Sequence, residues 1–497
     1  MPIALTKATG VYWNRYSGLE KQMASRKETL LKRHRRKKRA TLVAFACLLI
    51  AVGVLAGVVW VFPLLALAWA MHEAWFSDHL FYVPNADYVY CFDGQLEAVP
   101  VDFSDGRLTL AADVALFGED DTLLLAVTLR SSWAGRLFDP SVRIEAEGVE
   151  GDRQTFERGA KGVRYLNLTG FAGALLEHGE GVRLTGRHCR LEGTPRLWRA
   201  AHPDYRQKSL LVIAPHADDA ELAAFGLYSQ AREAWIVTLT AGEAEVGHYR
   251  RMGLERAEAA RLKGRLRAWD SLAVPLWAGV PVERTVQLGY FCMQLPAMRE
   301  APTEAVASRE ADLCDTRFFR ASNRVKLESD HDGVPSWDNL VADLREIILR
   351  AKPELIVLPH LVFDPHPDHV AATEAVRQAL AGLAWQPEAL LHYANHLHDN
   401  DRWPMGEAHE GVALPPLLEN VGVFVPWVLP LERSRQIDKA MALGMMHDLT
   451  VPLPFKRRCR RALQRFLVGR RHPPYGADDF FRKTVRRHEL FWVERSR

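Results

Sequence analysis

From Ser209 onward, short apolar runs alternate with amphipathic stretches, and this alternation limits the possible fold more than any other feature of the chain. Three runs have the length and aliphatic composition of buried strands: Ser209–Ala214, Ala234–Thr240 and Glu354–Pro359. Helical patterns follow or separate them, at about Asp219–Arg232, Trp337–Ala351 and Asp368–Leu380. Strands that alternate with helices form a parallel sheet covered on both faces. We therefore expect an α/β domain with a Rossmann-like parallel sheet over residues 205–497.

Two histidine–carboxylate clusters follow the first and third of these strands. One is Pro215-His216-Ala217-Asp218-Asp219, and the other is Asp364-Pro365-His366-Pro367-Asp368-His369. In open α/β sheets, ligands bind in the crevice beyond the carboxyl ends of the strands. If the two strands are neighbours, two histidines and a carboxylate converge on one ion.

Such a ligand set suits a catalytic zinc ion. Zinc in enzymes takes three nitrogen or oxygen ligands from the protein and keeps one position for water. A second carboxylate beside the ion can accept the proton of that water. Taken singly, either Asp218 or Asp219 would be a helix N-cap and a His-Pro pair would be a turn, but two clusters at matching strand ends favour a shared metal site. The same ligands would also accept iron or cobalt.

The two clusters together resemble the motifs of the PIG-L/LmbE family of zinc-dependent N-deacetylases. The first motif is matched by Pro215–Glu221 and the second by His366–His369. Between them, Thr240–Glu243 is similar to the family's Thr-x-Gly-Glu turn, and the resemblance extends over about Ser209–Leu380. Two positions depart from the pattern, because Ala217 replaces a proline and Phe225 precedes Gly226 where a Gly-Gly pair is common.

The resemblance implies a role for each residue of the clusters. It makes three residues the zinc ligands: His216, Asp219 and His369. It makes Asp218 the general base that activates water, and His366 a positively polarised group that stabilises the oxyanion or protonates the leaving amine. Asp368 would orient a histidine. The implied substrate is an N-acetyl amino sugar, which would release acetate and a free amine.

Residues 80–200 have a different rhythm, with short alternating or β-branched runs broken by Gly and Asp. Examples are Arg107–Leu110, Thr122–Leu129 and Val182–Thr185. These runs predict a small antiparallel, sandwich-like β-rich domain. Such a unit is more often a spacer than a carbohydrate-binding module, and both alternatives stay open.

An uncharged apolar run extends from Thr41 to Met71. At about 1.5 Å per residue it exceeds the ~30 Å hydrocarbon thickness, and it is too short for two spans of ~20 residues with a turn. The run therefore predicts one transmembrane helix. A cleaved signal peptide is the alternative, since Ala66-Leu67-Ala68 resembles a cleavage site, but the apolar stretch before it is unusually long.

A block of basic residues, Lys32–Arg39, directly precedes the apolar run. The positive-inside rule then places residues 1–40 in the cytoplasm, as a basic tail. With a single crossing, everything after Met71 would be extracytoplasmic, which is the periplasm in a bacterium with two membranes.

The positive charge of the chain is unevenly distributed. The net charge is +3, yet residues 1–40 alone hold twelve Lys or Arg and two Glu, so the remainder is net acidic. This argues against nucleic acid as a partner. A second basic segment, Lys456–Arg471, is either a solvated face or a contact with anionic lipid headgroups or phosphorylated glycans.

Five cysteines follow the apolar run, and none forms a CxxC pair, so a cysteine zinc site is not expected. Two disulfides are conceivable in an oxidising compartment, Cys91–Cys189 and Cys292–Cys314.

Together these patterns predict a membrane-anchored, zinc-dependent hydrolase that removes the N-acetyl group from an N-acetylglucosamine-type sugar. An envelope glycan or glycolipid, such as lipopolysaccharide or peptidoglycan-related material, is the expected substrate. Two alternatives stay open: an amidase acting on another amino-sugar conjugate, and a catalytically inactive glycan-binding or envelope-assembly protein.

Overall fold

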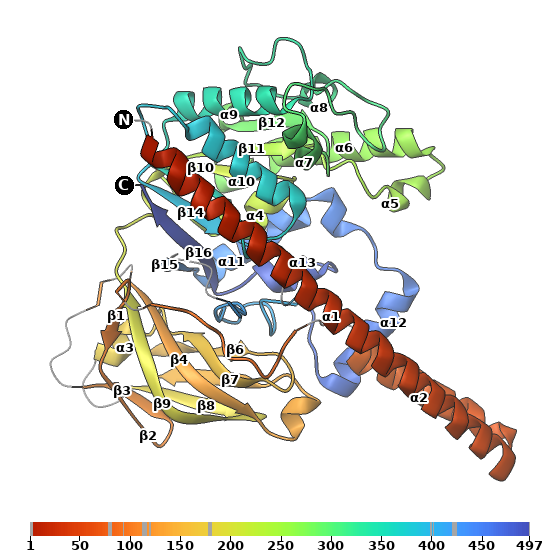
Figure 1. The fold of residues 1–497 in the computed structure, drawn as a ribbon. Coiled ribbons are helices and arrows are strands. Elements are labelled where there is room, and N and C mark those ends of the chain that lie inside the picture. Colours follow the sequence, from red (N-terminus) through yellow and green to blue (C-terminus); the bar gives the residue numbers. More distant parts are fainter. Residues whose placement is uncertain are drawn as a thin grey trace.

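The protein has a mixed α/β fold with three sheets and a long apolar helical segment at its N-terminus (Figure 1). The computed structural model describes residues 3–77, 82–92, 94–111, 117–118, 121–176, 181–397, 400, 402–419 and 425–496. Residues 80 and 81, where the β-rich region was expected to begin, lie outside these ranges.

The largest sheet has seven strands in the order β12-β11-β10-β13-β14-β16-β15. The strands are β10 (Ser209–Ala214), β11 (Glu233–Thr240), β12 (Thr285–Tyr290), β13 (Leu355–Pro359), β14 (Ala389–Tyr393), β15 (Val425–Pro430) and β16 (His488–Arg495). The first five strands in this order, β12, β11, β10, β13 and β14, pair in parallel. Strand β16 is antiparallel to both of its neighbours, β14 and β15. On one side of β10 the chain adds β11 and then β12. On the other side it adds β13 and then β14, so the strand order switches direction between β10 and β13.

Helices cover both faces of this sheet, as the alternating side chains of β10 show. Leu210 and Val212 belong to one buried apolar cluster, whereas Leu211 and Ile213 belong to another. A strand with two buried faces is apolar throughout, which explains the uninterrupted run in the sequence. The long helices are α4 (Asp219–Tyr228), α6 (Arg256–Ala273), α9 (Trp337–Ala351), α10 (Pro367–Leu380) and α11 (Arg433–Gly444). Shorter ones are α5 (Gly247–Arg250), α7 (Leu295–Glu300), α8 (Arg317–Arg320), α12 (Phe455–Leu463) and α13 (Asp479–Thr484).

Two antiparallel sheets occupy the region between residues 97 and 200. One has the order β1-β9-β4-β7 and the other β2-β3-β8-β5-β6. The strands are β1 (Glu97–Val99), β2 (Val101–Ser104), β3 (Arg107–Leu110), β4 (Thr122–Ser131), β5 (Ser141–Ala146), β6 (Val149–Thr155), β7 (Lys161–Asn167), β8 (Val182–Arg187) and β9 (Cys189–Ala200), with the short helix α3 (Ala172–Leu176). Leu125 of β4, Ile144 of β5 and Leu184 of β8 share one buried cluster. The two sheets therefore pack as a sandwich.

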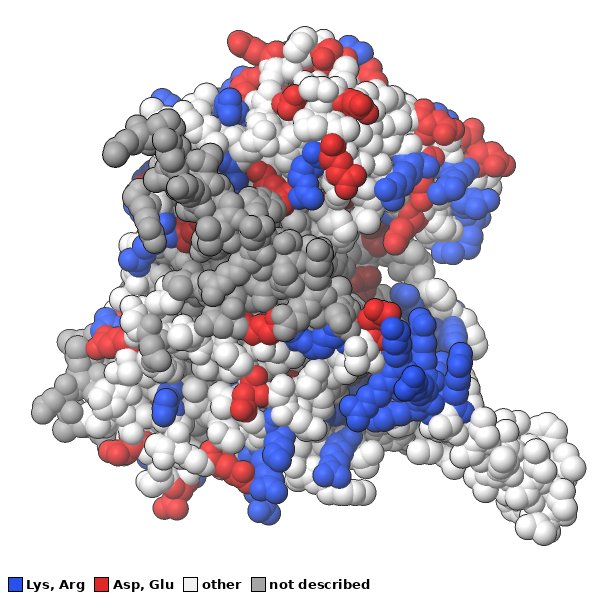
Figure 2. Space-filling model, in the orientation of Figure 1, with Lys and Arg blue, Asp and Glu red and all other residues white. Residues whose placement is uncertain are grey.

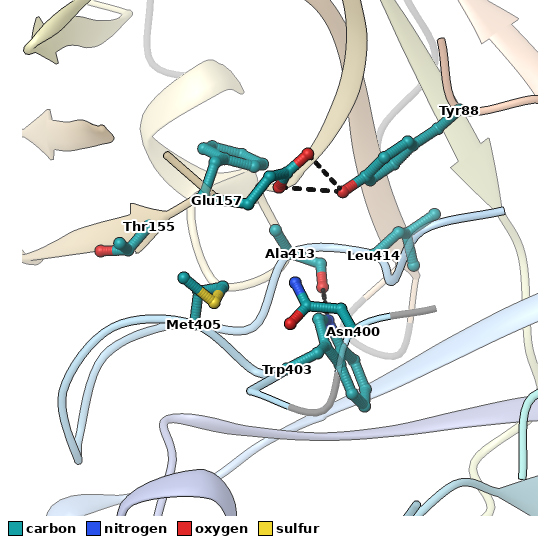
Figure 3. Close-up of a pocket in the computed structure, with 9 residues that line it drawn as sticks. Tyr88, Thr155, Glu157, Asn400, Trp403, Met405, Ala413 and Leu414 are labelled. Atoms are coloured by element: carbon teal, nitrogen blue, oxygen red, sulfur yellow. Dashed lines mark hydrogen bonds between the residues drawn. The ribbon is translucent and has the colours of Figure 1, made fainter. Parts of the chain in front are cut away.

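A loop at residues 402–414 joins the sandwich to the seven-stranded sheet. Two buried arginines donate hydrogen bonds to its carbonyl oxygens, Arg482 to Pro404 and Arg486 to Met405 and Gly411. The junction contains a cavity of only about 10 Å³, lined by Tyr88, Thr155, Phe156, Glu157, Asn400, Trp403, Met405, Ala413 and Leu414 (Figure 3). This is roughly the room of one water molecule, so the cavity is a packing defect rather than a ligand site.

The apolar N-terminal run folds as two helices. Helix α1 extends over Ile3–Leu55, and α2 over Val61–Met71, with a 3₁₀ turn at Val58–Trp60 between them. Gly57 has φ 98°, a conformation open to glycine, and a Cβ on Gly53 would lie 3.6 Å from Val61 Cγ2. The two helices therefore fold back on each other as an antiparallel hairpin. This corrects the expectation of one continuous helix over Thr41–Met71, because Gly57 breaks the run near its middle.

Both N-terminal helices are long and apolar enough to be candidate membrane spans, over Glu28–Leu55 and Val58–Phe76. The second candidate continues from α2 into a π-helical turn at His72–Phe76. All six cysteines, each within the described residues, have free thiols. The disulfides considered from the sequence, Cys91–Cys189 and Cys292–Cys314, are thus absent from the structure.

Gly226 of α4 provides a test of how tightly the helix packs. An added Cβ would overlap Leu431 and approach Glu489 Oε2 to 3.0 Å. We expect Gly226→Ala to destabilise the protein by about 1–3 kcal/mol through overpacking, measured as a lower midpoint of thermal unfolding. The control is Gly444→Ala at the end of α11, where a Cβ would meet nothing within 4 Å. An equal loss in both variants would contradict this account of the packing.

Candidate active site

The candidate site lies where β10 and β13 end side by side. The two strands pair in parallel with Leu210 opposite Leu355 and Val212 opposite Val357, so their carboxyl ends reach the same edge of the sheet. His216 follows β10 by two residues, and β13 leads through a short loop into α10, which begins at Pro367. Proline at the first position of α10 is pre-set for a helix. The site thus occupies the switch point where open α/β sheets bind ligands.

Three side-chain atoms from the two clusters meet at nearly equal distances. His216 Nδ1 and His369 Nε2 each lie 3.1 Å from Asp219 Oδ2, and the two nitrogens are 3.3 Å apart. All three residues are buried. One carboxylate oxygen and two imidazole nitrogens therefore face a common point.

Two further carboxylates fix the orientation of the imidazoles. Asp368 Oδ2 lies 3.1 Å from His216 Nε2, and Asp364 Oδ2 lies 2.9 Å from His369 Nδ1. A carboxylate accepts a hydrogen bond, so the proton of each neutral imidazole stays on the nitrogen that faces the carboxylate. The other nitrogen of each ring then presents a lone pair to the common point.

This arrangement fits a metal cation. Tetrahedral ligands at the ~2.0–2.1 Å typical of zinc would be roughly 3.3–3.4 Å apart, close to the spacing of the three atoms. Burial alone lowers the pKa of His369, yet Asp219 and Asp364 outweigh it and raise that pKa to about 10. The surroundings thus favour positive charge here, which a divalent cation supplies with both imidazoles neutral. His396, whose ring centroid is 5.0 Å from that of His369, is a further potential donor.

Asp218 stands beside this group in a strained conformation. Its φ is 106°, which is unusual for a residue other than glycine. Arg267 Nη2 lies 3.3 Å from Asp218 Oδ1, and the same nitrogen donates to the carbonyl oxygen of Ala217 at 2.5 Å. Burial raises the pKa of Asp218 to about 7, although Arg267 opposes the shift. A carboxylate with such a pKa can accept and release a proton near neutrality.

His366 lies over the edge of the cluster. Its ring centroid is 4.9 Å from that of His216 and 4.8 Å from that of His369. Burial, helped by His369 and His216, lowers the pKa of His366 to about 4, and its Nδ1 is buried without a hydrogen-bond partner. This shift favours the neutral form of the His366 imidazole, and the role of a positively polarised group stays a prediction.

The structure brings all six residues selected from the sequence into one cluster: His216, Asp218, Asp219, His366, Asp368 and His369. Sequence reasoning gave no role to Asp364 or to Asn395, whose Nδ2 donates to Asp219 Oδ1 at 2.8 Å. Asp364 stands inside the second cluster and could have been considered from its position. Asn395 follows β14, so its placement depends on strand order.

The segment Thr240–Glu243 supports the site through its glycine and its glutamate. Gly242 has φ 64°, and a Cβ there would overlap Nε of Arg267. Glycine therefore leaves the passage through which Arg267 reaches Asp218. Glu243 accepts a hydrogen bond from the Cys292 amide at 3.1 Å, and the next amide, of Met293, donates to Asp368 at 2.6 Å. Arg267, one of five basic residues on α6, was also missed from the sequence.

Residues 211–380, which include both clusters, match the family model described as PIG-L: GlcNAc-PI de-N-acetylase. This part of the chain is a PIG-L family domain. The resemblance seen in the sequence motifs is thereby confirmed. No curated protein matches the chain.

Solved structures give weaker similarities to the chain that contains this PIG-L domain. A deacetylase triple mutant from the teicoplanin biosynthetic pathway is 19% identical, with 58% of this chain and 98% of that chain covered and a TM-score of 0.30. A conserved protein from Thermus thermophilus is 18% identical, with 52% and 88% covered and a TM-score of 0.27. A 4-carboxy-2-hydroxymuconate hydratase from Pseudomonas putida is 13% identical, with 59% and 98% covered and a TM-score of 0.29. TM-scores this low establish no shared function.

The contact between Asp364 and His369 predicts an effect on metal affinity. Replacing Asp364 by Asn removes the charge that holds the His369 proton on Nδ1. We expect 10–100-fold weaker metal binding, measured by competition with a chromogenic chelator. Asp338→Asn, an exposed position on α9, is the control and should bind metal as the unchanged protein does. Equal affinity in the two variants would argue against the proposed orientation of His369.

Proposed function

We propose that the PIG-L domain is a zinc-dependent N-deacetylase that hydrolyses the acetamido group of an N-acetylglucosamine-type sugar. The observation that carries this proposal is the meeting of His216 Nδ1, Asp219 Oδ2 and His369 Nε2 beside a second buried carboxylate, Asp218. A binding site alone has no need of a proton acceptor next to a cation. The family match supports the deacetylase reaction.

In this proposal His216, Asp219 and His369 hold the zinc ion. Zinc would supply Lewis acidity to the amide carbonyl and to a water molecule. Asp364 and Asp368 keep the two imidazole lone pairs directed at the ion through the hydrogen bonds described above. These contacts fix the site before substrate arrives, so little reorganisation is needed during reaction.

Asp218 accepts the proton of the attacking water, whose oxygen forms a bond to the acetyl carbon. The C–N bond then breaks, and the nitrogen takes up a proton as the sugar amine leaves and acetate is released. His366 lies beside the ligands and donates a hydrogen bond to the developing oxyanion or carries the proton to the amine. Its low pKa makes it a ready donor once it has been protonated.

We further propose the arrangement of the whole chain around this activity. Residues 205–497 form a Rossmann-like catalytic domain, residues 80–200 form a sandwich-like domain beside it, and the apolar N-terminal hairpin anchors both to a membrane. Two candidate membrane spans support the anchor. An anchored enzyme meets substrates that are themselves attached to the membrane, so we favour an N-acetylated amino sugar on a glycolipid or an envelope glycan.

Asp218→Asn tests the role of the base. The change keeps the shape of the side chain but removes its ability to take a proton at neutral pH. We expect acetate release from N-acetylglucosamine-containing glycolipids to fall by about 10²–10⁴-fold, while zinc content stays stoichiometric. Acetate is measured enzymatically and zinc by atomic emission, with the protein purified in detergent.

A control for this test is His369→Ala, which should lose both zinc and activity. Undiminished activity in Asp218→Asn would remove Asp218 from the mechanism. Absence of acetate release from every such substrate by the zinc-loaded, unchanged protein would instead favour an amidase with another substrate or an inactive binding protein.

The contact of Arg267 with Asp218 predicts how kcat/KM depends on pH. Its positive charge lowers the pKa of Asp218, so Arg267→Met should raise that pKa further. Because Asp218 acts in its ionised form, the acidic limb of the kcat/KM profile should move to higher pH. Lys263→Met is the matched control, since Lys263 and Arg267 both pair with Asp448 but only Arg267 reaches Asp218. A shift of the same size in both variants would assign the effect to Asp448 instead.

A further inference from the structure

Much of the exposed apolar surface of the described residues belongs to the N-terminal hairpin. Its exposed large side chains are Leu42, Val43, Leu48, Ile50, Val54, Leu55, Val58, Val59, Trp60, Phe62, Leu65, Leu67, Trp69 and Met71. In Figure 2 the hairpin projects from the body as a lobe without charged side chains. An apolar surface of this size is stable in lipid rather than in water.

Both arms lie in candidate membrane spans, but the uncharged part of each is shorter than the hydrocarbon core of a bilayer. The uncharged part of α1, from Thr41 to Leu55, spans roughly 22 Å at ~1.5 Å per residue. Helix α2 has 11 residues, Val61–Met71, and spans roughly 17 Å. The hydrocarbon core is ~30 Å thick. A hairpin of this depth enters and leaves through the same face of the membrane.

The residues just before the hairpin and those just after it both contact the folded part of the chain beyond residue 80. Before it, Arg26 of α1 pairs with Glu419, which precedes β15. After it, Trp75 Nε1 donates to the carbonyl oxygen of Leu137, and Arg158 donates to the carbonyl oxygen of Trp75 at 2.9 Å. A single crossing would separate Arg26 from the body by the whole bilayer. The segments that precede and follow the hairpin therefore lie on one side.

The register of the hairpin places two basic segments at one level. Gly53 lies against Val61, and antiparallel helices rise equally per residue, so Glu73 is level with about Thr41. The basic block Lys32–Arg39 ends two residues before Thr41, so it lies close to the same level. Arg460 of α12 lies 2.7 Å from Glu73 Oε2, and Gln464 Nε2 donates to the Glu73 carbonyl oxygen at 3.4 Å.

Helix α12 has the composition of a membrane-surface helix. The exposed residues of α12 and of the turn that follows it include Phe455, Lys456, Arg457, Arg458, Arg465 and Phe466. Phe455 is 73% exposed and Phe466 87% exposed. A dense group of basic side chains lies at the root of the apolar lobe in Figure 2. Cations bind anionic headgroups, and aromatic rings enter the interface beside them.

We propose that the hairpin is inserted from the cytoplasmic face of the membrane, with α12 and Lys32–Arg39 resting on the anionic lipid headgroups of that face. The positive-inside rule assigns the basic block to the cytoplasm, and the hairpin keeps the catalytic domain on the same side. This replaces the extracytoplasmic location expected for a single crossing. The substrate, which rests on the proposed function, is then a lipid-linked N-acetyl amino sugar on the cytoplasmic leaflet.

Thiol labelling of the full-length protein tests the topology. Cys91 and Cys314 are exposed on the body, so a membrane-impermeant maleimide should label them only after spheroplasts have been permeabilised. Labelling in intact spheroplasts would overturn the proposal. In an Ala56→Cys variant, which places a thiol at the exposed turn and keeps Gly57, labelling of the turn in intact spheroplasts would show that the arms cross completely, and would overturn insertion from one face.

Trypsin cleavage tests the contact between α12 and anionic lipid. The full-length protein is reconstituted in vesicles of phosphatidylcholine, alone or mixed with phosphatidylglycerol. Cleavage after Lys456–Arg458 should slow several-fold in the anionic vesicles and recover in high salt, whereas cleavage at exposed Arg250 and Arg251 should be equal in both. Equal cleavage rates at α12 in the two kinds of vesicle would overturn the proposed contact of α12 with anionic headgroups. Neither experiment depends on catalysis, so a failure of the proposed deacetylase reaction would be seen separately.

Discussion

The candidate site depends first on the parallel pairing of β10 with β13. About 150 residues separate the two histidine clusters in sequence, and only this pairing brings His216 to within 3.3 Å of His369. The pairing is strongly specified, because β10 is apolar at every position after Ser209 and these residues alternate between the cores on the two faces. A shift of the register by one residue would exchange those faces and also separate the clusters. Folding of the apolar sheet and assembly of the site are thus one event.

The second constraint is electrostatic. The carboxylates of Asp219, Asp364 and Asp368 are buried at the site and that of Asp218 is only 12% exposed, and burial of unpaired charge is costly. Backbone amides offset part of the cost, since Met293 donates to Asp368 and Asn395 donates to Asp364. Arg267 offsets another part beside Asp218. Two neutral imidazoles add no charge, so a divalent cation among them completes the balance. Burial, together with the neighbouring negative charge of Asp219, raises the pKa of Asp218 to about 7.

The sequence predicted the features whose signals are local. The three strands were placed within one residue of β10, β11 and β13, because continuous aliphatic runs are diagnostic of strands buried on both faces. The two clusters were legible because each gathers several chemically distinctive residues within six positions. Arg267 and Asn395 are single residues whose roles arise from tertiary contacts, so no local pattern marked them. The hairpin was missed because hydropathy measures length and composition, whereas the fold depends on the backbone conformation of one glycine, Gly57. The position of β16 between β14 and β15 likewise depends on pairing between segments far apart in the sequence.

The C-terminal segment contacts both the helix that follows His216 and the root of the N-terminal hairpin. Glu489 of β16 accepts hydrogen bonds from the amides of Gly226 and Leu227 in α4, the helix that begins with Asp219, and pairs with buried Lys439 at 2.8 Å. The same segment contains α12, which holds Glu73 at the root of the hairpin. Buried polar contacts therefore link helix α4 to β16, and an ion pair joins α12 to Glu73 at the root of the hairpin. If the hairpin is inserted as proposed, the site would stand at a set distance from the bilayer, which would suit a sugar carried directly on a lipid better than a distant residue of a long polymer.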